Sequence, residues 1–226
     1  MTPVDRAFGD GPLSRAASGV YTLLVVEALL VLTGSPALLA MIMLGTDRSN
    51  APLLVLAALP LGPSIAAALY ALQHRSLDPA DLHPAAAFWR GYRLNAKAVL
   101  LVWLPWLAWL AVLAVNLANY AEAGLSAGWG LALVVVALAT MLWAANATVI
   151  VSLFAFRTRD VLRLAAVFLV RTPGVALANA ALLVVAVALT ALTSEAVLAV
   201  FGSVFVLGLL RNARPVVEAV RAEFTA

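Results

Sequence analysis

Long apolar runs separated by short polar stretches dominate this chain. A membrane-spanning helix needs about 20 predominantly apolar residues. Six stretches are read as spans, at about 19–44, 51–72, 98–119, 129–156, 174–193 and 196–210. The pattern therefore predicts an all-α polytopic transmembrane helix bundle, with residues 1–226 forming a single membrane domain.

The polar connections alternate between short and long. Short ones follow the first, third and fifth spans, and they read GTDRSN, YAEAGLSAG and SE. A charged segment with amphipathic character follows each even-numbered span, at 78–97, 157–171 and 211–224. Aromatic residues on one face and cations on the other are typical of a helix lying in the membrane interface. We therefore expect three helical hairpins, each followed by a cytoplasmic interfacial helix.

Helix-breaking residues interrupt the first two spans at matching depth. They are Gly34 and Pro36 in the first span, and Pro60, Gly62 and Pro63 in the second. Proline removes a backbone donor and clashes with the preceding turn. Interrupted spans at corresponding depths are a pointer to binding sites in transporters. We expect both spans to be broken near the middle of the membrane.

Glu27 is the only charged residue placed well inside a predicted span. Ser64, Asn146 and Ser203 fall at a similar depth, counted from the same side. A carboxylate there is costly and normally has a partner. In one interpretation Glu27 is neutral and joins neighbouring spans by hydrogen bonds. In the other it lines a small cavity and handles protons or a solute.

Composition agrees with the membrane class and narrows the chemistry. The chain is 65% hydrophobic and 11% charged, with mean hydropathy +1.04, whereas soluble domains carry about 25% charged residues. It has no cysteine, and its two histidines, His74 and His83, lack metal-site spacing. Nucleotide-binding and hydrolase motifs are absent. We therefore expect no enzyme activity, cofactor or metal. Residues 19–44 exceed the apolar core of a signal peptide, so we expect them to be retained.

The distribution of positive charge predicts the orientation. Thirteen of the fourteen Lys and Arg residues fall in the N-terminus, the two long connections and the tail, and only Arg48 falls on the other side. By the positive-inside rule, both termini are cytoplasmic. Arg90, Arg93 and Lys97 share one helical face and are expected to contact lipid head groups or a partner protein. No nucleic-acid-binding motif accompanies the charge.

Two stretches carry a resemblance to a known family. LPLGPSIAAALYAL at 59–72 and FWRGYRLNAKAVLLVW at 88–103 resemble the YesL-like family of bacterial integral membrane proteins, a domain of unknown function. The residues that carry the resemblance are Pro60, Gly62, Pro63, Ala68, Leu69 and Tyr70, then Phe88, Tyr92 and Asn95.

The resemblance implies a multi-pass protein of the bacterial plasma (inner) membrane with no assigned catalytic residue. Family members are often encoded beside carbohydrate ABC transporters, which implies an accessory or assembly role in carbohydrate uptake. The expected partners are the lipid bilayer and either ABC transporter permease subunits or further copies of the chain. The alternative is a small solute transporter or channel that uses the broken helices one and two around Glu27.

Overall fold

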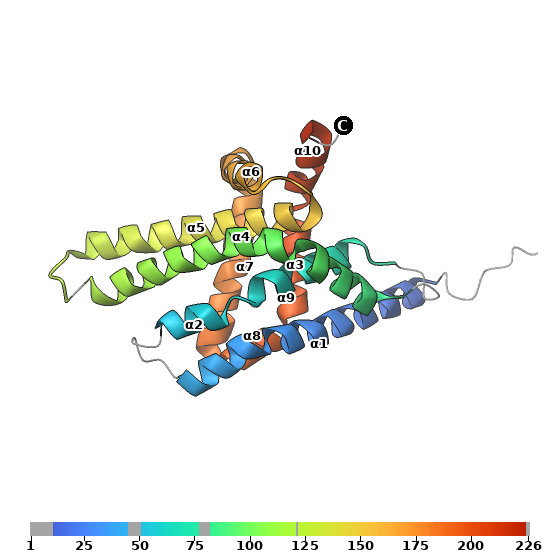
Figure 1. The fold of residues 1–226 in the computed structure, drawn as a ribbon, viewed down its shortest axis with the longest axis horizontal. Helices are drawn as coiled ribbons and strands as arrows, with labels where there is room; N and C mark the ends of the chain where they lie inside the picture. Colours follow the sequence, from blue (N-terminus) through green and yellow to red (C-terminus); the bar gives the residue numbers. More distant parts are fainter. Residues whose placement is uncertain (1–10, 45–50, 77–81, 121, 225–226) are drawn as a thin grey trace, which may run out of the picture.

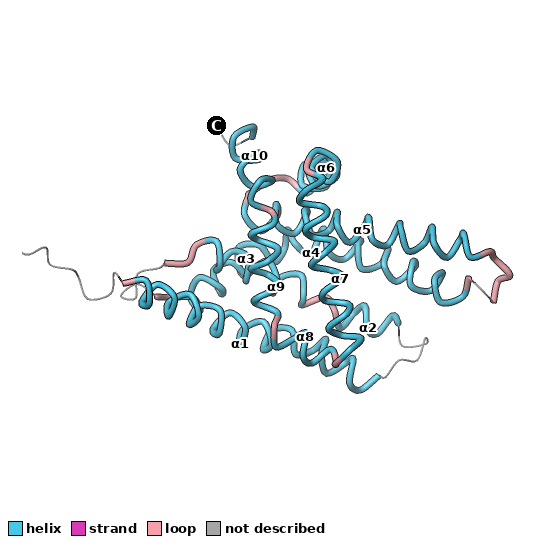
Figure 2. Tube along the Cα trace, turned by 180° about the vertical axis from the view of Figure 1, so that it is seen from behind, coloured by secondary structure: helices cyan, strands magenta, loops and turns pink. Residues whose placement is uncertain are grey.

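The computed structural model describes residues 11–44, 51–76, 82–120 and 122–224, and the regular structure in these ranges is entirely helical (Figures 1 and 2). The helices are α1 (Pro12–Leu44), α2 (Ala51–Ala57), α3 (Leu61–Gln73), α4 (Pro84–Asn119), α5 (Ala127–Leu153), α6 (Thr158–Arg171), α7 (Pro173–Leu192), α8 (Glu195–Val200), α9 (Gly202–Asn212) and α10 (Arg214–Phe224).

In the described part of the chain, four helices are long and apolar enough to cross a membrane. They are α1 (over Leu13–Ala40), α4, α5 and α7, and they correspond to the first, third, fourth and fifth predicted spans. This confirms an all-helical chain with helices of membrane-spanning length. The second and sixth predicted spans are each divided between two shorter helices.

The second predicted span breaks beside its first proline. Helix α2 ends at Ala57, a turn covers Ala58–Pro60, and α3 begins at Leu61. Pro63 lies in the first turn of α3, where a missing backbone N–H costs no hydrogen bond. The prolines therefore end one helix and start another.

The expected interruption of the first span at Gly34 and Pro36 is not formed. Helix α1 runs unbroken from Pro12 to Leu44 with Pro36 inside it. Pro36 cannot donate to the carbonyl of Leu32, four residues earlier. The hydroxyl of Ser35 donates to that carbonyl at 2.8 Å, so the neighbouring side chain supplies the hydrogen bond that proline removes.

The predicted interfacial segment 78–97 and the span 98–119 are not separate elements. From Pro84 onwards they form one helix, α4, of 36 residues; residues 77–81 lie outside the described part of the chain. At about 1.5 Å per residue this helix is longer than the roughly 30 Å hydrocarbon core. Residues 92–104 contain no glycine or proline, so the helix continues through the predicted boundary at residue 97. Arg90, Arg93 and Lys97 lie along its first half.

The sixth predicted span has a break that the sequence pattern does not predict. Helix α8 ends at Val200 and α9 begins at Gly202, with Phe201 between them. The other elements lie close to their predicted bounds. Helices α5 and α7 match the fourth and fifth predicted spans. Helices α6 and α10 match the amphipathic segments 157–171 and 211–224.

Helix α3 lies at the centre of the packing. It contacts α1, α4, α5 and α9, and Ala66, Ala67, Ala68 and Leu69 are fully buried. Small residues let helix backbones approach closely without the hydrophobic effect that drives packing in water. A Cβ on Gly91 of α4 would lie 2.7 Å from the Tyr70 side chain of α3, so this contact requires glycine.

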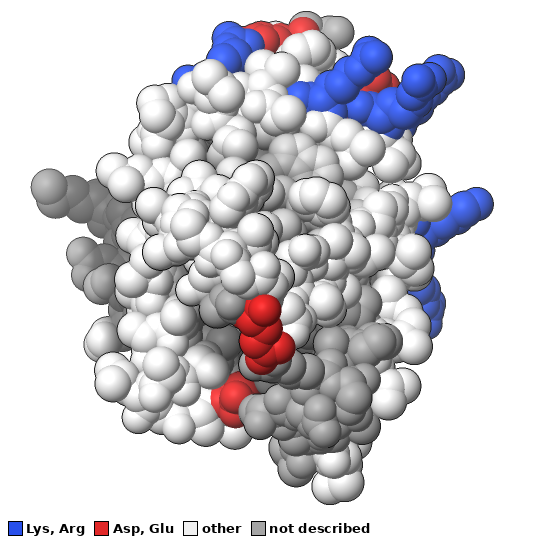
Figure 3. All heavy atoms as spheres, turned by 90° about the vertical axis from the view of Figure 1, so that its left-hand side faces the viewer, with Lys and Arg blue, Asp and Glu red and all other residues white. Residues whose placement is uncertain are grey.

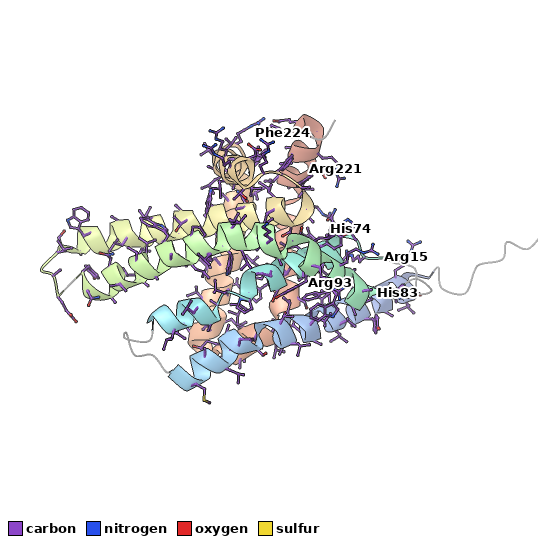
Figure 4. The ribbon with its side chains drawn as sticks, in the orientation of Figure 1. Arg15, His74, His83, Arg93, Arg221 and Phe224 are labelled. Carbon is purple, nitrogen blue, oxygen red and sulfur yellow. The ribbon has the colours of Figure 1, made fainter. Side chains whose placement is uncertain are left out.

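The labelled basic side chains lie on two sides of the molecule. Figure 4 places Arg15, His74 and His83 towards the end where α1 begins, and Arg221 on α10 at the top, close to Phe224. Figure 3 views the opposite end, which is largely uncharged, with acidic atoms near its centre and Lys and Arg confined to its upper and right-hand edges. The face seen in Figure 3 is therefore poor in Lys and Arg over most of its area.

A bidentate ion pair joins helices α6 and α10. Both terminal guanidinium nitrogens of Arg171 donate to the carboxylate of Glu223, at 3.0 and 2.9 Å. The hydrogen bonds from Arg171 lower the pKa of Glu223, and those to Glu223 raise the pKa of Arg171. Both side chains are substantially exposed, so solvent screens the pair.

This pair predicts a pH-dependent contact between α6 and α10. Because the pKa of Glu223 is lowered in the folded protein, the stabilisation is present above the unfolded-state pKa of about 4.3. It is lost as the pH falls through the lowered folded-state pKa. Since the chain has no cysteine, spin labels at Ala166→Cys and Ala222→Cys should show a broader distance distribution in acid. With Glu223→Gln the breadth should no longer change with pH; an unchanged pH response would contradict the assignment.

Candidate functional site at the helix breaks

The breaks in the second and sixth predicted spans lie against one another. Helix α3 contacts α9, and the first residues of these helices, Leu61 and Gly202, both line a cavity of about 320 Å³. Its walls are almost entirely apolar and come from α1, α3, α7, α8 and α9; they include Leu30, Gly34, Ile65 and Phe205. The cavity can accept an apolar group and offers few polar contacts.

Trp103 of α4 packs against the break between α2 and α3 and forms a hydrogen bond to it. Its indole N–H donates to the carbonyl of Ala58 at 3.1 Å, a group in the turn where regular helical hydrogen bonding stops. Its ring lies against Gly62, where a Cβ would come within 2.6 Å of Trp103 Cγ. The same carbonyl also accepts the backbone N–H of Leu61 at 3.1 Å, so Trp103 adds a second hydrogen bond to it and ties the turn to α4.

Glu27 of α1 forms a hydrogen bond to the break between α8 and α9. Its Oε2 atom accepts the backbone N–H of Ser203 at 2.6 Å. The first turn of α9 has no side-chain cap of its own, so Glu27 acts as an N-cap supplied by α1. A helix N-terminus carries partial positive charge, which favours a carboxylate there. The second oxygen, Oε1, is buried without a hydrogen-bond partner and would lie 3.4 Å from a Cβ on Gly202.

The other residues of the predicted intramembrane polar site have different roles. The hydroxyl of Ser64 donates to the carbonyl of Pro60, within its own helix turn, at 2.7 Å. Asn146 is buried on α5, and its Oδ1 atom has no partner. Of the four predicted residues, a hydrogen bond joins only Glu27 and Ser203, and it uses the backbone of Ser203 rather than its side chain.

Two polar contacts between helices were not predicted as pairs. Asn212 Nδ2 donates to Asn179 Oδ1 at 3.1 Å and joins α9 to α7. Asn95 Nδ2 donates to the carbonyl of Ser152 at 3.1 Å and joins α4 to α5. In the sequence, both contacts are indicated only by an amide side chain inside or beside an apolar run. Such a residue indicates a polar contact between helices but does not identify the partner.

The residues of the family resemblance lie in one packed region. Tyr70 of α3 packs on Gly91 of α4, Phe88 is fully buried, and Asn95 bonds α5. Together with Gly62 under Trp103, they fix α3 against α4 and α5. Their observed contacts are packing and helix joining.

The site's chemistry is that of a single carboxylate beside an apolar cavity. Over the described ranges, no three His, Cys, Asp or Glu side chains lie close enough to hold a metal ion. Glu27 is the one ionisable group among the residues that cap the two breaks. It can accept a hydrogen bond or carry a proton, and its Oε2 atom already accepts one from the protein.

Over the described ranges, the protein is all-helical. It has four helices long and apolar enough to cross a membrane, and side chains from other helices bind at two helix breaks. No protein-family model, curated protein or solved structure matches the chain at significant similarity. The function must therefore be argued from the residues of this chain.

Proposed function

We propose that the chain is an integral protein of the bacterial plasma membrane that crosses it six times, with both termini in the cytoplasm. The broken segments 51–73 and 195–212 would supply the second and sixth crossings, in addition to the four long helices. The proposal is supported by the distribution of Lys and Arg along the sequence, because thirteen of the fourteen fall in the segments assigned to the cytoplasm, as the positive-inside rule requires.

Reporter fusions test this topology. An enzyme that is active only outside the cytoplasm should be active when it is fused at Glu122, in the connection between α4 and α5, and inactive when it is fused at the C-terminus. A cytoplasm-specific reporter should give the opposite result. An active external reporter at the C-terminus would overturn the proposed orientation.

We propose further that the protein is a non-enzymatic accessory or assembly factor for a carbohydrate uptake system. The observation that carries the accessory role is the engagement of Glu27: its Oε2 atom caps α9, and the cavity beside it is apolar. That arrangement supports a carboxylate used to hold the bundle together. The link to carbohydrate uptake rests on the family resemblance alone.

Purification from native membranes tests the accessory role. After mild detergent extraction, a sugar-transporter permease should co-purify in fixed stoichiometry with the tagged full chain. A Glu27→Gln variant should retain that partner, because the glutamine oxygen can accept the Ser203 N–H. Purification of the chain without any permease, from membranes that express the uptake system, would contradict the proposal.

A transporter or channel is the second candidate, and the broken helices favour it. The pair of breaks differs from the expected one, because α1 is continuous and the breaks lie in the second and sixth predicted spans. Solute transporters commonly place their sites at such discontinuous helices. Pure protein in liposomes should then carry a labelled sugar in response to a proton gradient, and Glu27→Gln should abolish the flux.

A further inference from the structure

A second cavity lies where the end of α3 meets α9 and α10. Its volume is about 360 Å³. Four arginines line it, namely Arg75, Arg211, Arg214 and Arg221, together with one carboxylate, Glu218. None of these residues belongs to the helix breaks or to the basic face of α4.

Three of the four arginines of this cavity have no ion-pair partner among the described residues. Arg75, Arg211 and Arg214 form no salt bridge with Glu218 or with any other described carboxylate. Together with the carboxylate of Glu218, these three guanidinium groups give a formal charge of +2. Guanidinium groups present paired donors that match phosphate oxygens, so an anionic phosphate is the complementary ligand.

The cavity also has an apolar part to its lining. It is made by Leu72 at the end of α3, Leu207 and Leu210 on α9, and Val217 on α10. A free phosphate or nucleotide would gain nothing from these side chains. A phospholipid has a phosphate at one end and acyl chains at the other, and it would satisfy both parts of the lining at the depth of the membrane interface.

We propose that this cavity binds an anionic phospholipid, with its phosphate between Arg75, Arg211 and Arg214 and the start of its acyl chains against the leucine side chains of the lining. A lipid with two phosphates, of the cardiolipin type, should bind more tightly than one with a single phosphate. The bound lipid would fix α10 against α3 and α9. The site depends on the proposed membrane location and on neither proposed activity.

Lipid titration of the full chain in detergent tests this site. Cardiolipin should raise the apparent Tm in a saturable manner at about 0.15 M salt, because a ligand that binds only the folded state stabilises it. The double variant Arg211→Gln/Arg214→Gln should bind cardiolipin about 30-fold more weakly. The control is Arg159→Gln/Arg163→Gln on α6, which loses the same charge outside the cavity and should retain the affinity.

Each alternative gives a different result. Equal weakening in both double variants would reduce the effect to general charge attraction and overturn the site. Stabilisation by inorganic phosphate equal to that by cardiolipin would identify a free anion as the ligand and overturn the lipid assignment. Stabilisation by neutral phosphatidylcholine equal to that by cardiolipin would overturn the role of the arginines.

A single substitution keeps the test decisive if the double variant does not fold. Glu218→Gln removes the only carboxylate from the lining at an exposed position on α10. It should strengthen cardiolipin binding by about fivefold. Unchanged or weaker binding by this variant would contradict the proposal. The topology reporters read the membrane location separately, so failure here is distinguishable from failure there.

Discussion

Alanine in place of Gly62 should lower the stability of the protein markedly. The new Cβ would lie 2.6 Å from Trp103 Cγ, so the ring or the backbone would have to shift. Trp103 packs against Trp106 in a tilted arrangement at a centroid distance of 4.6 Å, and its N–H donates to the Ala58 carbonyl. Overpacking of this kind costs about 1–3 kcal/mol, measured as a fall in apparent Tm in detergent.

Gly19→Ala is the matched control for this substitution. Gly19 also lies in a helix, but nothing comes within 4 Å of a Cβ placed there. Alanine is favoured over glycine in a helix interior by roughly 0.5–1 kcal/mol, so this variant should be as stable as the parent or slightly more stable. If the two variants unfold at the same temperature, the contact between Gly62 and Trp103 does not hold the break.

Glu27→Ala should produce the second large effect. It removes the acceptor of the Ser203 N–H and leaves a buried donor unpaired at the start of α9, which costs about 1–3 kcal/mol. Besides a lower apparent Tm, we expect faster hydrogen exchange at the Ser203 amide, because the first turn of α9 loses its cap. The exchange measurement separates loss of the cap from a general loss of packing.

Two further variants sharpen this test. Glu27→Gln retains a side-chain oxygen at the same position and should restore most of the stability and the exchange protection. Ser203→Ala should preserve the cap, since the donor is the backbone N–H. If Glu27→Ala exchanges at Ser203 as slowly as the parent, the carboxylate does not cap α9.

The long apolar helices could be predicted from the sequence because their signal is local. Twenty or more apolar residues in a row give the four long helices, and the amphipathic patterns give α6 and α10. The break before α3 was also visible, since Pro60 acts on its own turn. Each of these predictions depends on residues that are close in sequence.

The predictions that were wrong concern the positions of helix breaks. These positions depend on hydrogen bonds from other side chains as well as on the positions of glycine and proline. Pro36 was expected to break α1, but the Ser35 hydroxyl supplies the missing hydrogen bond. The break at Phe201 was not predicted because no proline marks it. It is closed by Glu27, a residue 176 positions away in the sequence. The sequence marked Glu27 as a buried carboxylate in need of a partner, but it could not show that the partner was a backbone group of α9.

Because Glu27 and Ser203 are 176 residues apart in the sequence, the contact between them can form only late in synthesis. Glu27 is made with the first helix, and its partner is made only when the ribosome reaches residue 203. Until then the carboxylate lacks the backbone N–H that it accepts in the finished protein. A nascent or truncated chain that stops before α9 therefore leaves the Glu27 carboxylate without this hydrogen bond.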